Sequence, residues 1–178
     1  MNTKKIIKMV LIIILISIII FLCIKIPTIL NEKKVYKYIN DNNYKLDSNN
    51  VYTLTTTNNN ITTSNKLFYD KYFFSKCVIE TNNTKITKYN YFYTKNKEII
   101  IEYEISDFIN NEFKMESVKA TYKNNKLLNC ENIIGNLNCD NLNAHASNYE
   151  KEIKLILETN KINVNFLKNL KLNTNKKN

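Results

Sequence analysis

The chain has 178 residues and a formal net charge of +10, and all 26 of its basic residues are lysine. Glycine occurs once, which excludes a glycine-rich phosphate-binding loop. Without arginine the chain lacks the planar donor fork on which base-specific nucleic-acid sites rely, so we expect no nucleic-acid partner.

The first predicted element is a membrane-spanning helix from Ile6 to Ile26. The apolar run IIKMVLIIILISIIIFLCIKI has about 20 residues, and its helical length of roughly 30 Å matches the hydrocarbon core of a bilayer. Lys8 and Lys25 lie near its ends, where their stems reach the headgroups, and Ser17 can bond back to its own helix. The remaining, mostly polar chain is too small to bury such a helix, so the pattern favours lipid.

We interpret this helix as an uncleaved signal-anchor. It is longer than a signal-peptide core, and no small-x-small cleavage site follows it. Cys23 follows Phe21 and Leu22 rather than a small residue, so lipidation is not expected. Lysines flank both ends, and the slight excess on the N-terminal side predicts a cytoplasmic N-terminus and an extracytoplasmic C-terminal domain.

The segment after the membrane helix should hold one more short helix. Pro27 is expected to end or kink the membrane helix. Residues 32–40 (EKKVYKYIN) then predict a juxtamembrane helix with Val35, Tyr38 and Ile39 on one face, stopped by residues 41–43 (DNN).

Short strands separated by polar loops should follow. Residues 58–60 (NNN) and 62–65 (TTSN) predict loops because clusters of Asn, Ser and Thr are typical of turns. They separate predicted strands at residues 51–56 and 67–74.

The clearest pattern is a hairpin that folds about residues 95–97 (KNK). Apolar and aromatic side chains alternate in residues 87–93 and again in residues 99–105. One fold point pairs Tyr93 with Ile99, Tyr91 with Ile101, Tyr89 with Tyr103 and, on the other face, Lys88 with Glu104. A slip of one residue would break both sets of pairs, so the pattern fixes the register. We interpret the tyrosines as a core face rather than a base- or sugar-stacking platform.

Two more strands and a helix complete the predicted domain. Residues 113–122 should form a strand with a bulge between Met115 and Val118, followed by a tight turn at residues 124–125 (NN) into residues 126–130. Residues 135–136 (GN) predict a further turn into a strand at residues 137–139.

The chain then becomes helical. Ser147 and Glu150 have the spacing of a capping box and predict the start of this helix, and Asn160 predicts its end. Tyr149, Ile153, Ile156 and Leu157 share one face of it. Phe166, Leu167 and Leu170 should add a last short turn, and residues 173–178 a frayed tail.

Three cysteines, Cys77, Cys130 and Cys139, follow the membrane helix. A hairpin between residues 130 and 139 would bring Cys130 and Cys139 together as a disulfide. The alternatives are a bridge from Cys77 to one of them, or three buried thiols that act as small apolar residues.

No catalytic, cofactor or metal site is predicted. Cys77, Cys130, Cys139 and His145 lack the Cys-x-x-Cys spacing of a zinc site. A Cys–His nucleophilic pair built on His145, the only histidine, remains the alternative that would make the chain an envelope enzyme. Glu102 and Glu104 alternate with apolar residues and indicate a solvated strand face rather than a glycosidase pair.

The predicted fold class is α+β: a transmembrane helix, a small antiparallel sheet and a packed C-terminal helix. The expected boundaries are an anchor at 1–30, a juxtamembrane segment at 31–46, the domain at 47–172 and a disordered tail at 173–178.

The layout MNTKKIIKMVLIIILISIII, then VYKYINDNNYKL, then strands and the helix SNYEKEIKLILE resembles N-terminally anchored extracytoplasmic proteins of low-GC Gram-positive bacteria. It is also similar in layout to anchored entry-fusion proteins of poxviruses, whose outer domains carry disulfides. The first resemblance implies an extracytoplasmic domain and carries over no site residues.

We therefore predict a non-enzymatic interaction module at the cell envelope. Its partners would be the bilayer and an envelope protein or anionic polymer. Outside Met1–Leu30 the chain holds 22 Lys against 16 Asp and Glu, and this lysine excess fits an anionic partner as well as simple solubility. The alternatives are the Cys–His enzyme and a subunit of a viral fusion complex.

Overall fold

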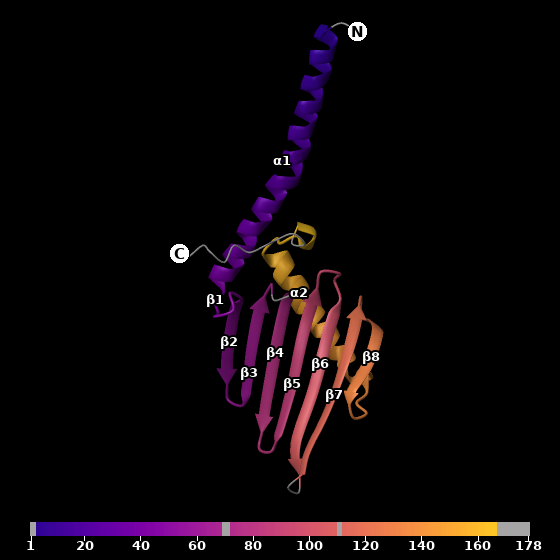
Figure 1. The fold of residues 1–178 in the computed structure, drawn as a ribbon. Coiled ribbons are helices and arrows are strands. Elements are labelled where there is room, and N and C mark those ends of the chain that lie inside the picture. The colour runs from indigo at the N-terminus through magenta and orange to yellow at the C-terminus, as the bar shows by residue number, and fades with distance from the viewer. Residues whose placement is uncertain (1–2, 69–71, 110–111, 167–178) are drawn as a thin grey trace.

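The computed structural model describes residues 3–68, 72–109 and 112–166 and confirms the α+β class (Figure 1). A long helix, α1 (Thr3–Asp41), precedes a sheet of eight antiparallel strands, and a second helix, α2 (Asn143–Thr159), packs on that sheet. The strands are β1 (Lys45–Leu46), β2 (Tyr52–Asn58), β3 (Ile61–Leu67), β4 (Tyr72–Asn82), β5 (Lys85–Thr94), β6 (Ile99–Ile109), β7 (Glu112–Lys123) and β8 (Lys126–Ile134). Two short 3-10 helices, η1 (Cys139–Leu142) and η2 (Val164–Phe166), flank α2.

Helix α1 is continuous where the sequence predicts two helices. Pro27 was predicted to end or kink the helix, and because it lies inside α1 the first of these alternatives is wrong. An interior proline loses the hydrogen bond that an N–H would donate, and its ring crowds the carbonyl of the preceding turn, yet α1 continues on both sides of Pro27. The predicted juxtamembrane helix is the last part of α1, and its end at Asp41 agrees with the stop signal at residues 41–43.

The two halves of α1 have different surroundings. From Ile6 to Ile26 the apolar side chains are exposed, and α1 is long and apolar enough to cross a membrane. Ser17 bonds to the carbonyl oxygen of Ile13 at 2.9 Å, as the sequence predicts. In the last turns, the predicted face of Val35, Tyr38 and Ile39 is buried in the domain core. One helix therefore forms both the apolar segment and part of the core.

The strands follow one another in the sheet in the order of the sequence. The predicted register of β5 and β6 is confirmed, with Tyr93 opposite Ile99, Tyr91 opposite Ile101, Tyr89 opposite Tyr103 and Lys88 opposite Glu104. The tight turn between β7 and β8 is also confirmed, because Asn124 and Asn125 both have positive φ angles, of 50° and 60°.

Two predictions around β3 are wrong. Residues 62–65 form strand β3 rather than a loop, because β-branched threonine suits a strand when a neighbour pairs with it. The strand predicted at residues 67–74 is two strands, since β3 ends at Leu67 and β4 begins at Tyr72. Phe68, which follows β3, has a φ angle of 54° and so does not continue the strand.

Two predictions around β7 and β8 are also wrong. The bulge expected within β7 lies on the neighbouring strand β8. Strand β7 pairs with β6 in unbroken register, whereas Ile133 of β8 is an extra residue opposite Ser117 and Val118 of β7. Residues 137–139 form no strand. The chain turns at Gly135, which has a φ angle of +78°, and returns to η1.

Helix α2 and the end of α1 cover one face of the sheet. Tyr149, Ile153 and Leu157 of α2 are buried as predicted, and Asn160 caps its end. The capping box at Ser147 is wrong, because α2 begins at Asn143, without a side-chain cap, where it continues directly from η1. Phe166 closes η2, whereas Leu167, Leu170 and residues 173–178 lie outside the described residues.

Candidate interaction surface

The face of the sheet under α2 holds the only histidine among tyrosine rings. His145 of α2 stacks on Tyr89 at a centroid distance of 4.7 Å, and its Nδ1 shares a hydrogen bond of 2.9 Å with the Tyr91 hydroxyl. On the same face Lys76 of β4 forms an ion pair of 2.7 Å with Glu152 of α2. His145 thus joins α2 to the sheet.

The cysteines are not brought to His145. Cys77 lies between Lys76 and Val78 on β4, and because Lys76 faces α2, Cys77 points to the opposite face of the sheet. Burial raises the pKa of the Cys77 thiol, against the effect of Lys88 and Lys66. A Cys–His nucleophilic pair therefore has no geometric basis in the described residues.

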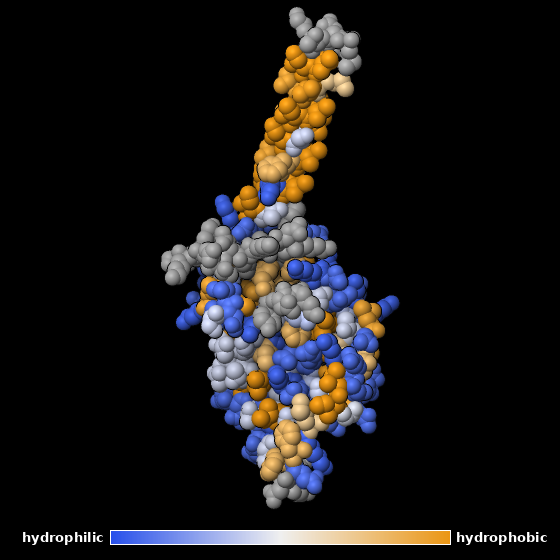
Figure 2. Space-filling view, in the orientation of Figure 1, coloured by the Kyte–Doolittle hydropathy of each residue, from blue (hydrophilic) through white to orange (hydrophobic). Residues whose placement is uncertain are grey.

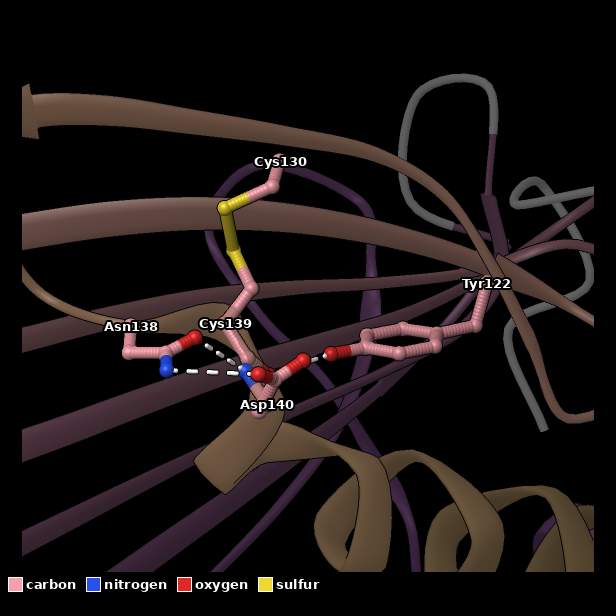
Figure 3. The surroundings of a disulfide bond; sticks show 5 residues. All are labelled: Tyr122, Cys130, Asn138, Cys139 and Asp140. Carbon is pink, nitrogen blue, oxygen red and sulfur yellow. Dashed lines mark hydrogen bonds between the residues drawn. A yellow bond between two sulfur atoms is a disulfide. The ribbon is translucent and has the colours of Figure 1, made fainter.

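Cys130 and Cys139 form a disulfide, with Cα atoms 6.1 Å apart (Figure 3). The sequence suggested that a hairpin would bring the two cysteines together, but they do not lie on a hairpin. Cys130 is exposed on β8, whereas Cys139 is buried at the start of η1. Two further bonds hold this return of the chain: Tyr122 donates to the Cys139 carbonyl at 2.8 Å, and the Asn138 side chain accepts from the Asp140 N–H at 2.8 Å. Among the described residues no His, Cys, Asp and Glu side chains group as a metal site.

Tyrosines dominate the covered face and the adjoining end of α1. Burial is the main cause that raises their pKa values. The pKa of Tyr89 rises to about 12, and the pKa of Tyr149 lies well above its ordinary value. The same effect holds for Tyr38, Tyr44, Tyr91, Tyr93 and Tyr122. These phenols are core groups that stay protonated in the folded domain.

The opposite face of the sheet, here called the open face, has no helix over it in the described structure (Figure 1). Its centre is polar and charged: Glu102 of β6 pairs with Lys119 of β7 at 2.9 Å, and both side chains are about one third exposed. Glu104 and Lys88 line the same shallow hollow of about 320 Å³. The sequence correctly assigned Glu102 and Glu104 to a strand face exposed to solvent.

Apolar side chains gather at the corner of the open face that lies beside β8 and away from α1 (Figure 2). Phe108 and Phe113 are paired across β6 and β7, and their side chains are 50% and 67% exposed. Ile133 and Ile134 of β8 are 53% and 45% exposed. We call these four residues the apolar corner. Exposed aromatic and aliphatic side chains that adjoin one another mark interaction surfaces more often than isolated ones do.

Strand β8 forms the edge of the sheet next to this corner. All nine of its residues are exposed, including Leu127 and Leu128. Among the described residues it makes no hydrogen bond beyond its pairing with β7, so its outer N–H and C=O groups face solvent. The other edge differs, because β1 is two residues long and β2 carries the polar sequence TTTN at its end.

The sequence pattern did not reveal this edge. KLLNCENII reads as a strand, but whether a strand lies inside a sheet or at its edge depends on pairing with distant segments. The pair Phe108 and Phe113 carried a weak signal, since two aromatic residues lie on either side of the polar pair NN at positions 110–111 of the sequence. Comparison of the chain with protein-family models, curated protein sequences and solved structures finds no match.

Proposed function

We propose that the chain is a single-pass membrane protein whose extracytoplasmic domain binds another protein by strand addition at β8. The observation that carries this proposal is the exposed, apolar, unpaired edge of β8 beside the apolar corner. In strand addition an extended peptide bonds to the free edge of a sheet, and pockets or apolar surfaces beside the edge select its side chains.

The proposed topology rests on two features. The exposed apolar half of α1 favours a lipid environment, because in water its apolar side chains would remain exposed to solvent. The disulfide between Cys130 and Cys139 fits a compartment in which disulfides form and persist, outside the cytosol. Together they support an anchor in the membrane and a domain on its outer side.

The chemistry of the edge favours a polypeptide as its partner. Unpaired backbone donors and acceptors alternate along β8, and only another backbone matches them in series. The leucines and isoleucines of β8 and the phenylalanines of the apolar corner would contact alternate apolar side chains of the added strand. A polysaccharide or polyphosphate would leave this apolar surface uncovered.

A second copy in the same membrane does not fit the edge. Antiparallel pairing of two β8 strands in one sheet requires a two-fold axis perpendicular to the sheet, which reverses the strand direction. The strands run lengthwise from the end where α1 leaves the domain to the far end (Figure 1). In such a pair the partner copy would point its α1 away from the membrane, which argues against β8–β8 pairing and favours a different chain as the partner.

The irregularities of β8 favour a dedicated partner. The register with β7 shifts between Ser117 and Val118 and again between Thr121 and Tyr122. Such bulges twist an edge and prevent indiscriminate pairing with other strands. Only a segment that follows the bulged edge would bind it.

Site-specific photocrosslinking tests the proposal. A photoreactive phenylalanine analogue at position 113, in the 178-residue chain expressed in intact cells, should give a discrete adduct with one protein. Peptide mapping should place the crosslink within an extended apolar segment of that protein. The double variant L128K/I133K, which puts charges on β8, should abolish the adduct.

The matched control is L155K, because Leu155 is an apolar residue of α2 that is 65% exposed, and α2 packs on the face of the sheet opposite the apolar corner. This variant should leave the adduct unchanged. An adduct that persists in L128K/I133K, or the absence of any discrete adduct from position 113, would refute strand addition at β8.

A further inference from the structure

The two ends of the sheet differ in charge. Two turns at the end from which α1 leaves the domain carry lysine: Lys95 and Lys97 between β5 and β6, and Lys123 and Lys126 around the turn between β7 and β8. The acids in the described turns at this end are fewer: Glu98, which pairs with Lys123 at 3.7 Å, and Asp47 in the turn between β1 and β2. The turns at residues 58–60 and 82–84, which the structure describes at the far end, carry no lysine. Around the far turns acidic groups exceed lysines, with Glu80, Asp107, Glu112 and Glu116 against Lys85 and Lys114.

The lysines at the anchor end are built into ordered structure. The Thr94 hydroxyl accepts hydrogen bonds from the N–H groups of Asn96 and Glu98, at 3.2 and 3.1 Å, and fixes the turn that presents Lys95 and Lys97. Lys34 of α1 donates to the backbone carbonyl of Lys161 at 2.9 Å, which fixes the Lys34 ammonium beside the segment that follows α2.

Most of these charges are not neutralised within the domain. Six exposed lysines at this end form no ion pair with a described residue; we call them the basic end: Lys33, Lys34, Lys95, Lys97, Lys126 and Lys161. Lys97 and Lys161 line an open hollow of about 390 Å³ with Lys154, Asn163 and a single acid, Glu158. The hollow is large enough for a phosphate-bearing headgroup.

The anchor places the basic end against the bilayer. Asn31 is buried and bonds to the backbone of Asn163 twice, at 2.7 and 3.2 Å, so the domain is attached to α1 at this point. Asn31 follows Ile26 by five residues, which is about 7.5 Å along a helix. The headgroup layer on each side of a bilayer is roughly 5–8 Å thick. The hollow and its lysines therefore lie at the level of the headgroups or directly beside them.

We propose that the basic end binds the anionic phospholipid headgroups of the membrane that α1 spans. The proposal rests on the membrane anchoring proposed above and adds the lipid class that the domain contacts. Anionic headgroups would form ion pairs with the lysines that the domain leaves unpaired. Contact with the membrane at these turns, in addition to the attachment at α1, would keep the strands roughly perpendicular to the membrane. The apolar corner then lies at the end of the domain farthest from the membrane.

The expected strength follows from the number of lysines. A lysine near an anionic membrane surface gains a factor of about five in its association with that surface. Because this attraction falls off within the Debye length, about 8 Å at physiological ionic strength and 3 Å at 1 M salt, high salt should abolish it.

Lysine footprinting of the 178-residue chain in lipid nanodiscs tests the proposal. The chain is reconstituted in discs of phosphatidylcholine alone or of phosphatidylcholine with phosphatidylglycerol, and acetylation of each lysine by an amine-reactive ester is followed by mass spectrometry. We expect Lys97, Lys126 and Lys161 to react about fivefold more slowly in the anionic discs. Lys85 and Lys114, at the far end, are internal controls and should react equally in both.

A pair of variants separates binding from simple steric cover. K97Q/K161Q should raise the reaction rate of Lys126 in anionic discs toward its rate in zwitterionic discs, whereas K85Q/K114Q should not change it. Salt at 1 M should remove the difference between the discs in the unmodified chain.

Equal rates in the two kinds of disc would overturn the proposal, whether the lysines are open in both or covered in both. It would also be overturned if a soluble polyanion protected them in zwitterionic discs while anionic lipid did not, because the lysines would then belong to a polymer site. A chain that fails to enter any disc contradicts the proposed anchor instead, so the two failures are distinguishable.

Discussion

Removal of the disulfide between Cys130 and Cys139 should weaken the domain without unfolding it. The bridge closes a loop of nine residues in sequence separation. The loss of chain entropy that such a loop causes in the unfolded state corresponds to about 2.7 kcal/mol at 25 °C. In a domain of this size that loss lowers the midpoint of thermal unfolding by roughly 10 °C.

The fold should survive because other contacts hold the same return of the chain. The hydrogen bond from Tyr122 to the Cys139 carbonyl and the Asn138 bond to Asp140 do not depend on the bridge. The buried position of Cys139 also remains available to an apolar side chain, so C130A/C139A keeps its packing.

The assay is thermal unfolding of the 178-residue chain in nanodiscs, followed by circular dichroism. The midpoint of thermal unfolding should be about 10 °C lower for C130A/C139A than for the unmodified chain. Reductant should lower the midpoint of the unmodified chain by the same amount. C77S is the matched control, since Cys77 is unbridged, and should melt within a few degrees of the unmodified chain. Intact mass after denaturation should show two alkylated thiols without reductant and four with it. A double variant that melts normally, or a C77S variant that becomes insensitive to reductant, would refute the pairing.

Three other perturbations test the packing of the domain. N31A removes two hydrogen bonds that the buried Asn31 side chain makes with the Asn163 backbone, so the free energy of unfolding should fall by about 1–3 kcal/mol. Hydrogen exchange at residues 160–166 should rise. The exposed Asn40 gives the control N40A, and equal effects of the two variants would contradict the role of Asn31. G135A should lower the free energy of unfolding by more than about 1 kcal/mol, because Gly135 has a φ angle of +78° and a Cβ there would lie 2.9 Å from Glu116 Cγ. Adding E116A to G135A should recover only the part of this loss that comes from the steric contact. A G135A variant as stable as the unmodified chain in denaturant would disprove the strain. The core tyrosines have pKa values raised above the unfolded value near 10. The stability of the domain should therefore be full below pH 10 and fall as the pH rises toward 12, the pKa of Tyr89 in the folded state. Tyrosinate absorbance should rise together with unfolding, and a smooth titration near pH 10 with unchanged circular dichroism would contradict their burial.

The sequence predicted those elements that a local pattern determines. The register of β5 and β6 was predicted because the fold point at residues 95–97 satisfies the apolar pairs and the Lys88–Glu104 pair at once. The exposed helix from Ile6 to Ile26 was predicted because no soluble core could enclose it. The buried face of α2 followed from its helical spacing.

Predictions failed where tertiary contacts decide the structure. The polar composition of residues 62–65 predicts a loop, yet β2 and β4 pair with them on both sides and make them a strand. The proline signal predicts that the helix ends or kinks at Pro27, yet α1 continues to Asp41 because its later turns pack Val35 and Ile39 into the core. Helix α2 begins before its apparent capping box because η1 and the buried Leu142 already direct the chain.

The candidate surfaces were the least predictable from sequence. Exposure of β8 follows from its place at the end of the strand order, and the apolar corner needs residues of β6, β7 and β8 that only the register brings together. The lysine excess was evident from composition, but its concentration at the anchor end follows from which turns lie at that end of the sheet.

Protease treatment of intact cells is the most direct test of the proposed topology. The cells express the 178-residue chain with an epitope tag at its C-terminus, and the fragments are detected after carbonate washing of the membranes. An anchored domain outside the cytoplasm predicts loss of the tag from intact cells, with a short fragment containing α1 left in the washed membranes. A tag that stays protected until the cells are permeabilised, or the intact chain in the water-soluble fraction, would contradict that topology.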